Sequence, residues 1–240
     1  MSRLALSSNR KRKSKYALLP SGAGGITFVG MGTLSDTSGS TSYSVDIPTF
    51  EDEDFAVMHA HMGSGGQLNN TPSGWDQRFS LSDNNPTPNR VKVWTRHLQT
   101  GDGDPTVTTT QVQLFIARIY VFRGVKSAVV IEDSDSKLAN GNDVSPVTGC
   151  KLATADPTSN GALIVQGHIG ADAVSYPISS IQDGSGFTEI HRTNMASSGK
   201  MAAGYRVVNP GSYAPINFIL SGAPTPYPLR WSWMLALQAA

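Results

Sequence analysis

The sequence predicts an all-β protein: an antiparallel β-sandwich of jelly-roll-like form with an extended N-terminal arm. About ten short segments are apolar or alternate between apolar and polar residues, and Gly, Pro, Asn or Asp turns separate them. No segment shows the 3.6-residue apolar period of an amphipathic helix. A chain of 240 residues that is 39% hydrophobic can bury a substantial core as one domain.

Each expected strand has a local reason. Thr41–Ile47 alternates and stops at Pro48, and Arg90–Arg96 alternates strictly. Leu114–Phe122 is the longest apolar run, which predicts a central strand buried on both faces. In chain order, the expected strands are Ile26–Val29, Thr41–Ile47, Phe55–Met62, Arg90–Arg96, Thr106–Thr110, Leu114–Phe122, Ala128–Ile131, Ala162–Gln166, Ala202–Val208, Ile216–Leu220 and Leu229–Leu237.

Residues 1–25 are expected to form a basic, flexible arm, and residues 26–240 a single sandwich domain. Six basic residues and no acidic ones fall in the first fifteen positions, and the other 225 residues carry 13 basic against 18 acidic side chains. Like charges and the Gly-rich hinge at 21–25 disfavour compact structure. The arm residues singled out are Arg10, Lys11, Arg12, Lys13, Lys15, Tyr16, Leu18 and Leu19.

Several motifs follow one another in a fixed order. The segment Tyr43–Pro48 precedes an acidic turn, Glu51–Asp54, which opens the hydrophobic segment Phe55–His61. A Pro-Ser-Gly-Trp turn follows within Thr71–Trp75, and Ile119–Val125 ends in Phe-Arg-Gly-Val. This ordered set resembles a module of tailed-bacteriophage virion proteins, namely tail-fibre, minor-tail and head-spike or decoration domains. The motif residues that carry the resemblance are Pro72, Ser73, Gly74, Trp75, Phe122, Arg123 and Gly124.

The resemblance implies a non-enzymatic structural protein of a virion, assembled in the host cytoplasm as a homo-oligomer, with a homotrimer favoured. Its arm would dock on other virion proteins, with Tyr16, Leu18 and Leu19 as apolar anchors for a neighbour's sheet edge or groove. A host-surface glycan is a further candidate partner. No apolar run reaches the ~18–20 residues of a membrane helix, so no membrane partner is expected.

Two alternatives stay open. The chain could be the single jelly-roll capsid protein of a small virus, whose basic arm binds the genome by neutralising phosphates. Six charges are few for genome packaging, so the sequence favours docking over nucleic-acid binding. The chain could also be a carbohydrate-binding module for host adhesion, since tryptophan rings suit the apolar faces of sugars.

No residue pattern predicts catalysis, a metal or a cofactor. Ser73 lacks the Gly-x-Ser-x-Gly context of a hydrolase nucleophile, and the single cysteine, Cys150, lacks a motif partner. His59 and His61 share one strand face, but they are expected to be solvent-facing and lack a third ligand. The acidic segments Glu51–Asp54, Asp102–Asp104 and Glu132–Asp135 carry calcium-type oxygens, yet solvated hairpin loops explain them better.

The C-terminal strand is expected to contribute to a subunit interface, because it concentrates large apolar side chains. Core packing is the competing explanation for its tryptophans. The residues assigned to the oligomer interface are Trp231, Trp233, Met234 and Leu235.

Overall fold

The computed structural model describes residues 25–62, 66–81, 91–126, 131–139, 162–170, 178–181, 188–195, 199–208, 218–220 and 230–240. Within these ranges the regular structure consists of fifteen β-strands and no helix, and all strand pairs are antiparallel. The all-β, antiparallel class predicted from the sequence is therefore confirmed. No helix long and apolar enough to cross a membrane occurs in the described ranges.

The first large sheet is built from the N-terminal half of the chain. Its strands run in the order β1-β8-β4-β6-β5, and β2 also pairs with β8. The members are β1 (Thr27–Met31), β2 (Ser35–Thr37), β4 (Phe55–Met62), β5 (Asp76–Leu81), β6 (Val91–His97) and β8 (Phe115–Arg123). The predicted central strand, Leu114–Phe122, corresponds to β8, whose apolar side chains are buried on both faces.

The second large sheet is built from the C-terminal half, in the order β12-β13-β10-β15-β9. Two short ribbons, β3–β7 and β11–β14, complete the described structure. The remaining strand bounds are β3 (Ser42–Ser44), β7 (Thr106–Thr108), β9 (Ile131–Ala139), β10 (Ala162–Gly170), β11 (Ile178–Ile181), β12 (Thr188–Met195), β13 (Gly199–Val208), β14 (Phe218–Leu220) and β15 (Arg230–Leu237).

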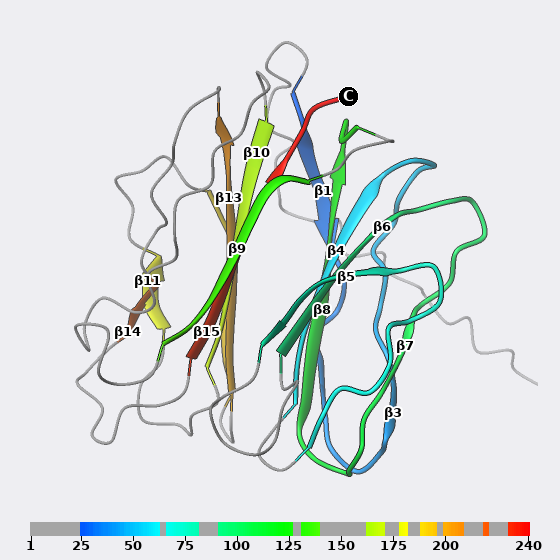
Figure 1. Cartoon of the computed structure of the whole chain (residues 1–240), viewed down its shortest axis with the longest axis vertical. Helices are drawn as coiled ribbons and strands as arrows, with labels where there is room; N and C mark the ends of the chain where they lie inside the picture. The colour runs from blue at the N-terminus through cyan, green and yellow to red at the C-terminus, as the bar shows by residue number, and fades with distance from the viewer. Residues whose placement is uncertain are drawn as a thin grey trace, which may run out of the picture.

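The two large sheets face each other as two layers (Figure 1) and share one apolar core. Phe55, Val57 and Phe122 from the first sheet pack in the same cluster as Tyr205 and Trp233 from the second. Each strand contributes alternate residues to this cluster, as expected when side chains point to opposite faces in turn. The two antiparallel sheets therefore pack against each other through this core.

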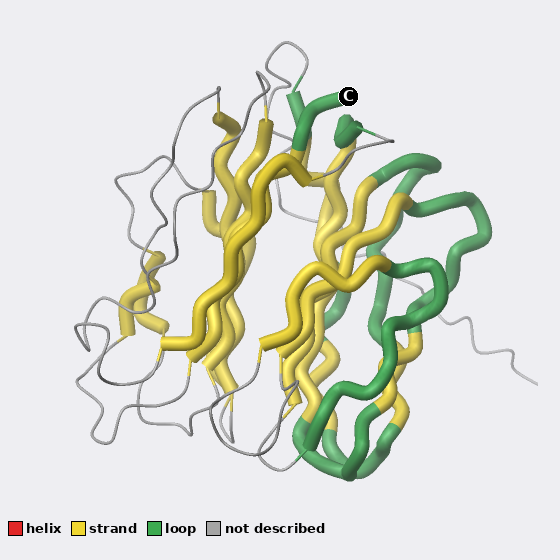
Figure 2. Tube along the Cα trace, in the orientation of Figure 1, coloured by secondary structure: helices red, strands yellow, loops and turns green. Residues whose placement is uncertain are grey.

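A second core covers the outer face of the first sheet. Met58, Trp94 and Ile119 point away from the sandwich interior and pack with Tyr43 and Val107 from the β3–β7 ribbon. Figure 2 shows this ribbon and several loops (green) beyond the first sheet. Every residue of β4 is consequently buried, although the strand contains two histidines. The first sheet is the middle layer of three, which a simple two-layer sandwich did not predict.

Two predicted loops or strands need correction. The segment Glu132–Asp135, expected as a hairpin loop, lies inside β9, which pairs with β15 at the edge of its sheet. Charged residues are common on edge strands, where they oppose pairing with another chain. The expected strand Thr41–Ile47 is shorter, because only Ser42–Ser44 pairs with β7.

Candidate functional site

The acidic turn and the Phe-Arg-Gly-Val motif meet at one end of the first sheet. Arg123 donates from Nε to Asp54 Oδ1 at 2.8 Å and from Nη2 to Asp54 Oδ2 at 2.9 Å. Its Nη1 lies 3.1 Å from a carboxylate oxygen of Glu51. The hydrogen bond to Asp54, which is 2% exposed, is the main reason why the pKa of Arg123 rises above its ordinary value. A two-bond pair of this kind fixes geometry as well as charge.

The other acidic groups at this end brace a neighbouring loop. Asp52 accepts hydrogen bonds from the backbone N–H and the hydroxyl of Thr100. Asp102 accepts from the backbone N–H of Gln99 at 2.9 Å, and Asp104 accepts from that of Ile47 at 2.9 Å. Among the described residues, no group of three or more His, Cys, Asp or Glu side chains could hold a metal ion. These carboxylates act as structural acceptors within the loops.

The Pro-Ser-Gly-Trp turn closes on Arg96 of β6. The backbone N–H of Trp75 donates to Pro72 O at 3.1 Å, and Gly74 has φ of +78°. A Cβ atom on Gly74 would lie 2.8 Å from Arg96 Nη1, so this position requires glycine for both conformation and space. Arg96 donates to Ser73 O at 3.2 Å and forms an ion pair with Asp102.

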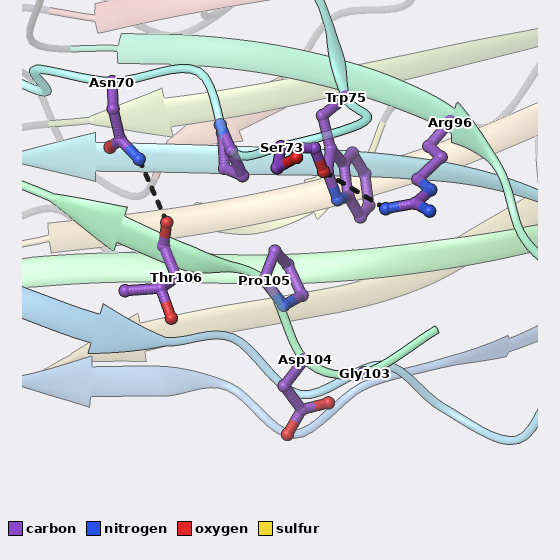
Figure 3. Close-up of a pocket in the computed structure, with 9 residues that line it drawn as sticks. Asn70, Ser73, Trp75, Arg96, Gly103, Asp104, Pro105 and Thr106 are labelled. Carbon is purple, nitrogen blue, oxygen red and sulfur yellow. Dashed lines mark hydrogen bonds between the residues drawn. The ribbon is translucent and has the colours of Figure 1, made fainter. Parts of the chain in front are cut away.

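A pocket of about 290 Å³ lies beside this turn. Its lining comes from two facing loops, 70–75 and 103–106, and from Arg96 on β6 (Figure 3). Asn70 joins the loops: its Nδ2 donates to Thr106 O at 3.2 Å, and its Oδ1 accepts from the backbone N–H of Thr108 at 2.7 Å. The pocket walls are therefore held by hydrogen bonds on both sides, as in preformed ligand sites.

Trp75 is the aromatic residue of the lining. It is 5% exposed and packs in the outer core of the first sheet. Its indole N–H donates no hydrogen bond to another described residue and is not among the buried polar atoms without a partner, so it is open to solvent. Figure 3 shows the ring beside Ser73 and the Arg96 guanidinium group. The hydroxyl groups of Ser73 and Thr106 likewise make no side-chain hydrogen bond to described residues. The pocket thus offers unused polar groups next to an aromatic ring and two prolines.

The prediction that His59 and His61 face solvent is wrong. Both are 0% exposed, because β4 lies between β6 and β8 and its inner face packs on the second sheet. The ring of His59 meets Trp233 edge-on, with centroids 5.2 Å apart. The two histidines share the face of Phe55 and Val57, which belong to the core between the sheets.

A buried polar pair links the two sheets. Tyr120 Oη of β8 lies 2.8 Å from His191 Nε2 of β12, and the rings stack with centroids 5.6 Å apart. Burial, together with a smaller contribution from the positive charge of Arg118, lowers the pKa of His191 to about 3. Burial also raises the pKa of Tyr120. A neutral imidazole that accepts from the tyrosine O–H satisfies both groups.

Three of the four residues assigned to the oligomer interface are buried within one chain. Trp233, Met234 and Leu235 are each 0% exposed, so none of these side chains is on a surface that another copy could contact. The physical reason is that β15 is an inner strand of its sheet, between β10 and β9. The side chain of Trp231 and all the singled-out arm residues, from Arg10 to Leu19, lie outside what the structure describes.

Among the predicted motif residues, the structure brings Pro72, Ser73 and Trp75 to the pocket and Arg123 to the acidic turn. Phe122 lies in the core between the sheets. Sequence reasoning missed Arg96, Asn70 and the Tyr120–His191 pair. Arg96 ends an alternating strand and could have been noted there, but nothing local predicts its contact with a turn 23 residues away.

Comparison of the chain with family models, curated proteins and solved structures gives no match. The fold and the pocket therefore define the chain only as an all-β protein with two large antiparallel sheets and a polar pocket at the edge of the first.

Proposed function

We propose that this protein is a non-enzymatic structural component of a tailed-bacteriophage virion, of the fibre, spike, tail, neck or decoration type. It assembles as a homo-oligomer, with a trimer favoured, and docks on other virion proteins through residues 1–25. One observation supports the proposal most. The motifs that resemble the virion module form one framework, in which Arg123 clamps the acidic turn and Arg96 clamps the Pro-Ser-Gly-Trp turn.

This framework is structural in character. Its carboxylates and guanidinium groups are paired with each other or with backbone N–H groups, which suits a rigid scaffold. A catalytic site would need a nucleophile or base aimed at a substrate position. Phe55 of β4 pairs with His97 of β6 and with Phe122 of β8, so these three strand ends are adjacent. The motif residues therefore hold loops at one end of the first sheet.

The jelly-roll-like form of the two sheets is also part of this proposal. Support comes from the two facing antiparallel sheets with a shared core. The connectivity weighs against two interleaved Greek keys, because the first sheet uses only strands up to β8 and the second only strands from β9 onward. A virion scaffold does not depend on that connectivity.

The test uses a phage from which the gene for this protein has been deleted. The protein is supplied from a plasmid in the host cell, and the assembled particles are then analysed. Full-length protein should enter the particles, and a variant without residues 1–25 should remain folded but stay outside them. A matched variant with Gln at Arg10, Lys11, Arg12, Lys13 and Lys15 keeps the apolar anchors. Docking through those anchors predicts that this variant still enters, and failure of the full-length protein to enter would overturn the virion assignment.

The genome-binding alternative gives a different result. In that case the full-length protein would bind duplex DNA with a log–log salt slope of about −5, because up to six phosphates are neutralised. The Gln variant would then lose DNA binding. Normal incorporation of the truncated chain together with that slope would favour a genome-facing arm over a docking arm.

A further inference from the structure

We propose that the pocket beside the Pro-Ser-Gly-Trp turn binds one pyranose unit of a neutral glycan. The inference goes beyond virion assembly and does not depend on it, because it concerns binding by a single folded chain. The pocket is lined by Trp75, Ser73, Arg96, Asp104 and Thr106 together with two prolines (Figure 3).

The central observation is the indole N–H of Trp75. A buried tryptophan normally finds an acceptor for this group. Trp75 is 5% exposed, and its N–H donates no hydrogen bond to another described residue. This nitrogen is not among the buried polar atoms that lack a partner, so it is open to solvent. Because Trp75 lines the pocket, a bound molecule can replace water as the acceptor for this N–H. A sugar hydroxyl can accept a hydrogen bond from this N–H and donate a hydrogen bond to another group at the same time.

The remaining polar groups suit a polyhydroxyl ligand. The hydroxyls of Ser73 and Thr106 can each donate or accept, and Asp104 keeps one carboxylate oxygen after its other oxygen accepts from Ile47 N. Pro72 and Pro105 supply apolar surface for the C–H face of a sugar ring. This mixture of a few polar groups and an apolar wall is what fixes the orientation of a small ligand in a pocket.

The charge of the lining selects against acidic sugars. The guanidinium group of Arg96 is neutralised by its ion pair with Asp102. Asp104 then remains as the unbalanced charge among the lining residues, and it is negative. A sialic acid or uronic acid carboxylate placed beside it would be repelled. Neutral hexoses and N-acetylhexosamines avoid this repulsion.

The size and rigidity of the pocket favour a single ring over an extended peptide. A volume of about 290 Å³ lies at the lower end of the range for small-molecule sites. Asn70 ties one wall to the other, and Arg96 ties the turn to the loop that carries Asp102. Walls held in this way need little ordering when a ligand binds. A proline-rich peptide could also bind beside a tryptophan ring, but such peptides are extended and would need a longer groove.

The test follows the indole N–H signals of the full-length protein by NMR as methyl glycosides of glucose, galactose, mannose and N-acetylglucosamine are added up to about 20 mM. The chain has four tryptophans, and the Trp75→Phe variant assigns the relevant signal. At least one neutral glycoside should shift the Trp75 signal in a saturable manner, whereas sialic acid should not. Absence of a shift with all four glycosides, or a stronger shift with sialic acid, overturns the proposal.

Two pocket variants and one control complete the experiment. Ser73→Ala and Asp104→Asn should each weaken binding roughly fivefold, since each removes or weakens a hydrogen bond to the ligand. Asparagine can still accept from the Ile47 N–H, so Asp104→Asn should remain folded. Gln77→Ala, on the exposed side of β5, should bind as tightly as the unmodified chain. Equal affinities in all variants, or tight binding of a proline-rich peptide with no sugar binding, would contradict the assignment.

Discussion

Acidification should destabilise the fold through His191, the imidazole that links the two large sheets. The folded-state pKa of His191, about 3, lies below the ordinary value of about 6.5, so the unfolded chain holds the proton more tightly. The contribution of His191 to stability is therefore fully present above pH 6.5 and is lost as the pH falls from 6.5 toward 3. The lowered pKa follows mainly from burial, since the residue is 7% exposed.

The magnitude follows from the separation of the two pKa values. One proton taken up on unfolding lowers the free energy of unfolding by about 2 kcal/mol at pH 5 and by about 3 kcal/mol at pH 4. Solvent screening should reduce this change in the free energy of unfolding little, because the imidazole is buried and bonds to Tyr120 of β8. A loss of this size is a substantial fraction of the stability of an ordinary domain.

The assay is urea unfolding between pH 7 and pH 4, with the unmodified chain compared with His191→Gln. Other groups can also take up protons on unfolding, so only the difference between the two curves reports on His191. Glutamine cannot titrate and can still bond to Tyr120, so the variant should lose about 2 kcal/mol less between pH 7 and pH 5. His97→Gln serves as the matched control, because the His97 side chain is 17% exposed and is therefore less buried than His191.

Parallel stability curves for the unmodified chain and His191→Gln would refute the reasoning. Should the variant fail to fold, NMR titration of the unmodified chain decides the matter. The imidazole signals of His191 should then stay those of the neutral form down to about pH 4. Titration near pH 6 in the folded protein would show that the ring is solvated and the pair with Tyr120 is open.

Three further outcomes follow from the packing. Gly74→Ala should cost more stability in thermal unfolding than Gly101→Ala: both glycines have positive φ, but only at Gly74 would a Cβ meet a guanidinium group at 2.8 Å. Equal losses would mean that the turn relaxes. Asp54→Ala should lower the free energy of unfolding by about 2 kcal/mol and free the Arg123 side chain, since the hydrogen bonds to a buried carboxylate are lost while the remaining guanidinium group is 44% exposed; a loss within measurement error contradicts this. Trp233→Ala should cost about 3–5 kcal/mol without changing the oligomeric state measured by native mass spectrometry, because the side chain is in the core of one chain.

The inner strands were predictable because their sequences carry the pattern of burial. The apolar run Leu114–Phe122 identified β8, and the alternation in Arg90–Arg96 identified β6. Edge strands have one neighbour and one exposed side, so their composition is close to that of a loop. Asp76–Leu81 forms β5 and Thr188–Met195 forms β12, and both are polar edge strands that the alternation did not reveal.

The burial of the histidine-bearing inner face of β4 could not be inferred from any one segment. His59 and His61 suggest a solvent face when Phe55–Met62 is considered alone. Their burial depends on a second sheet that begins about seventy residues later, at Ile131. The Tyr120–His191 bond likewise joins residues 71 positions apart and depends on how the sheets are aligned. Local patterns specify which residues form strands, whereas pairing between layers depends on contacts distant in sequence.

Arg96 belongs both to the pocket and to the structural framework, which links stability to the proposed sugar binding. Arg96 holds the Pro-Ser-Gly-Trp turn through Ser73 O and is itself held by Asp102. Loss of Asp102 would release the guanidinium group and leave Arg96 as an unpaired cation at the pocket wall. The charge of the lining would then no longer disfavour acidic sugars. The Arg96–Asp102 ion pair therefore holds the turn and also determines which ligand charge the proposed site accepts. Trp75 likewise has two roles, because its ring packs in the outer core of the first sheet while the residue lines the pocket.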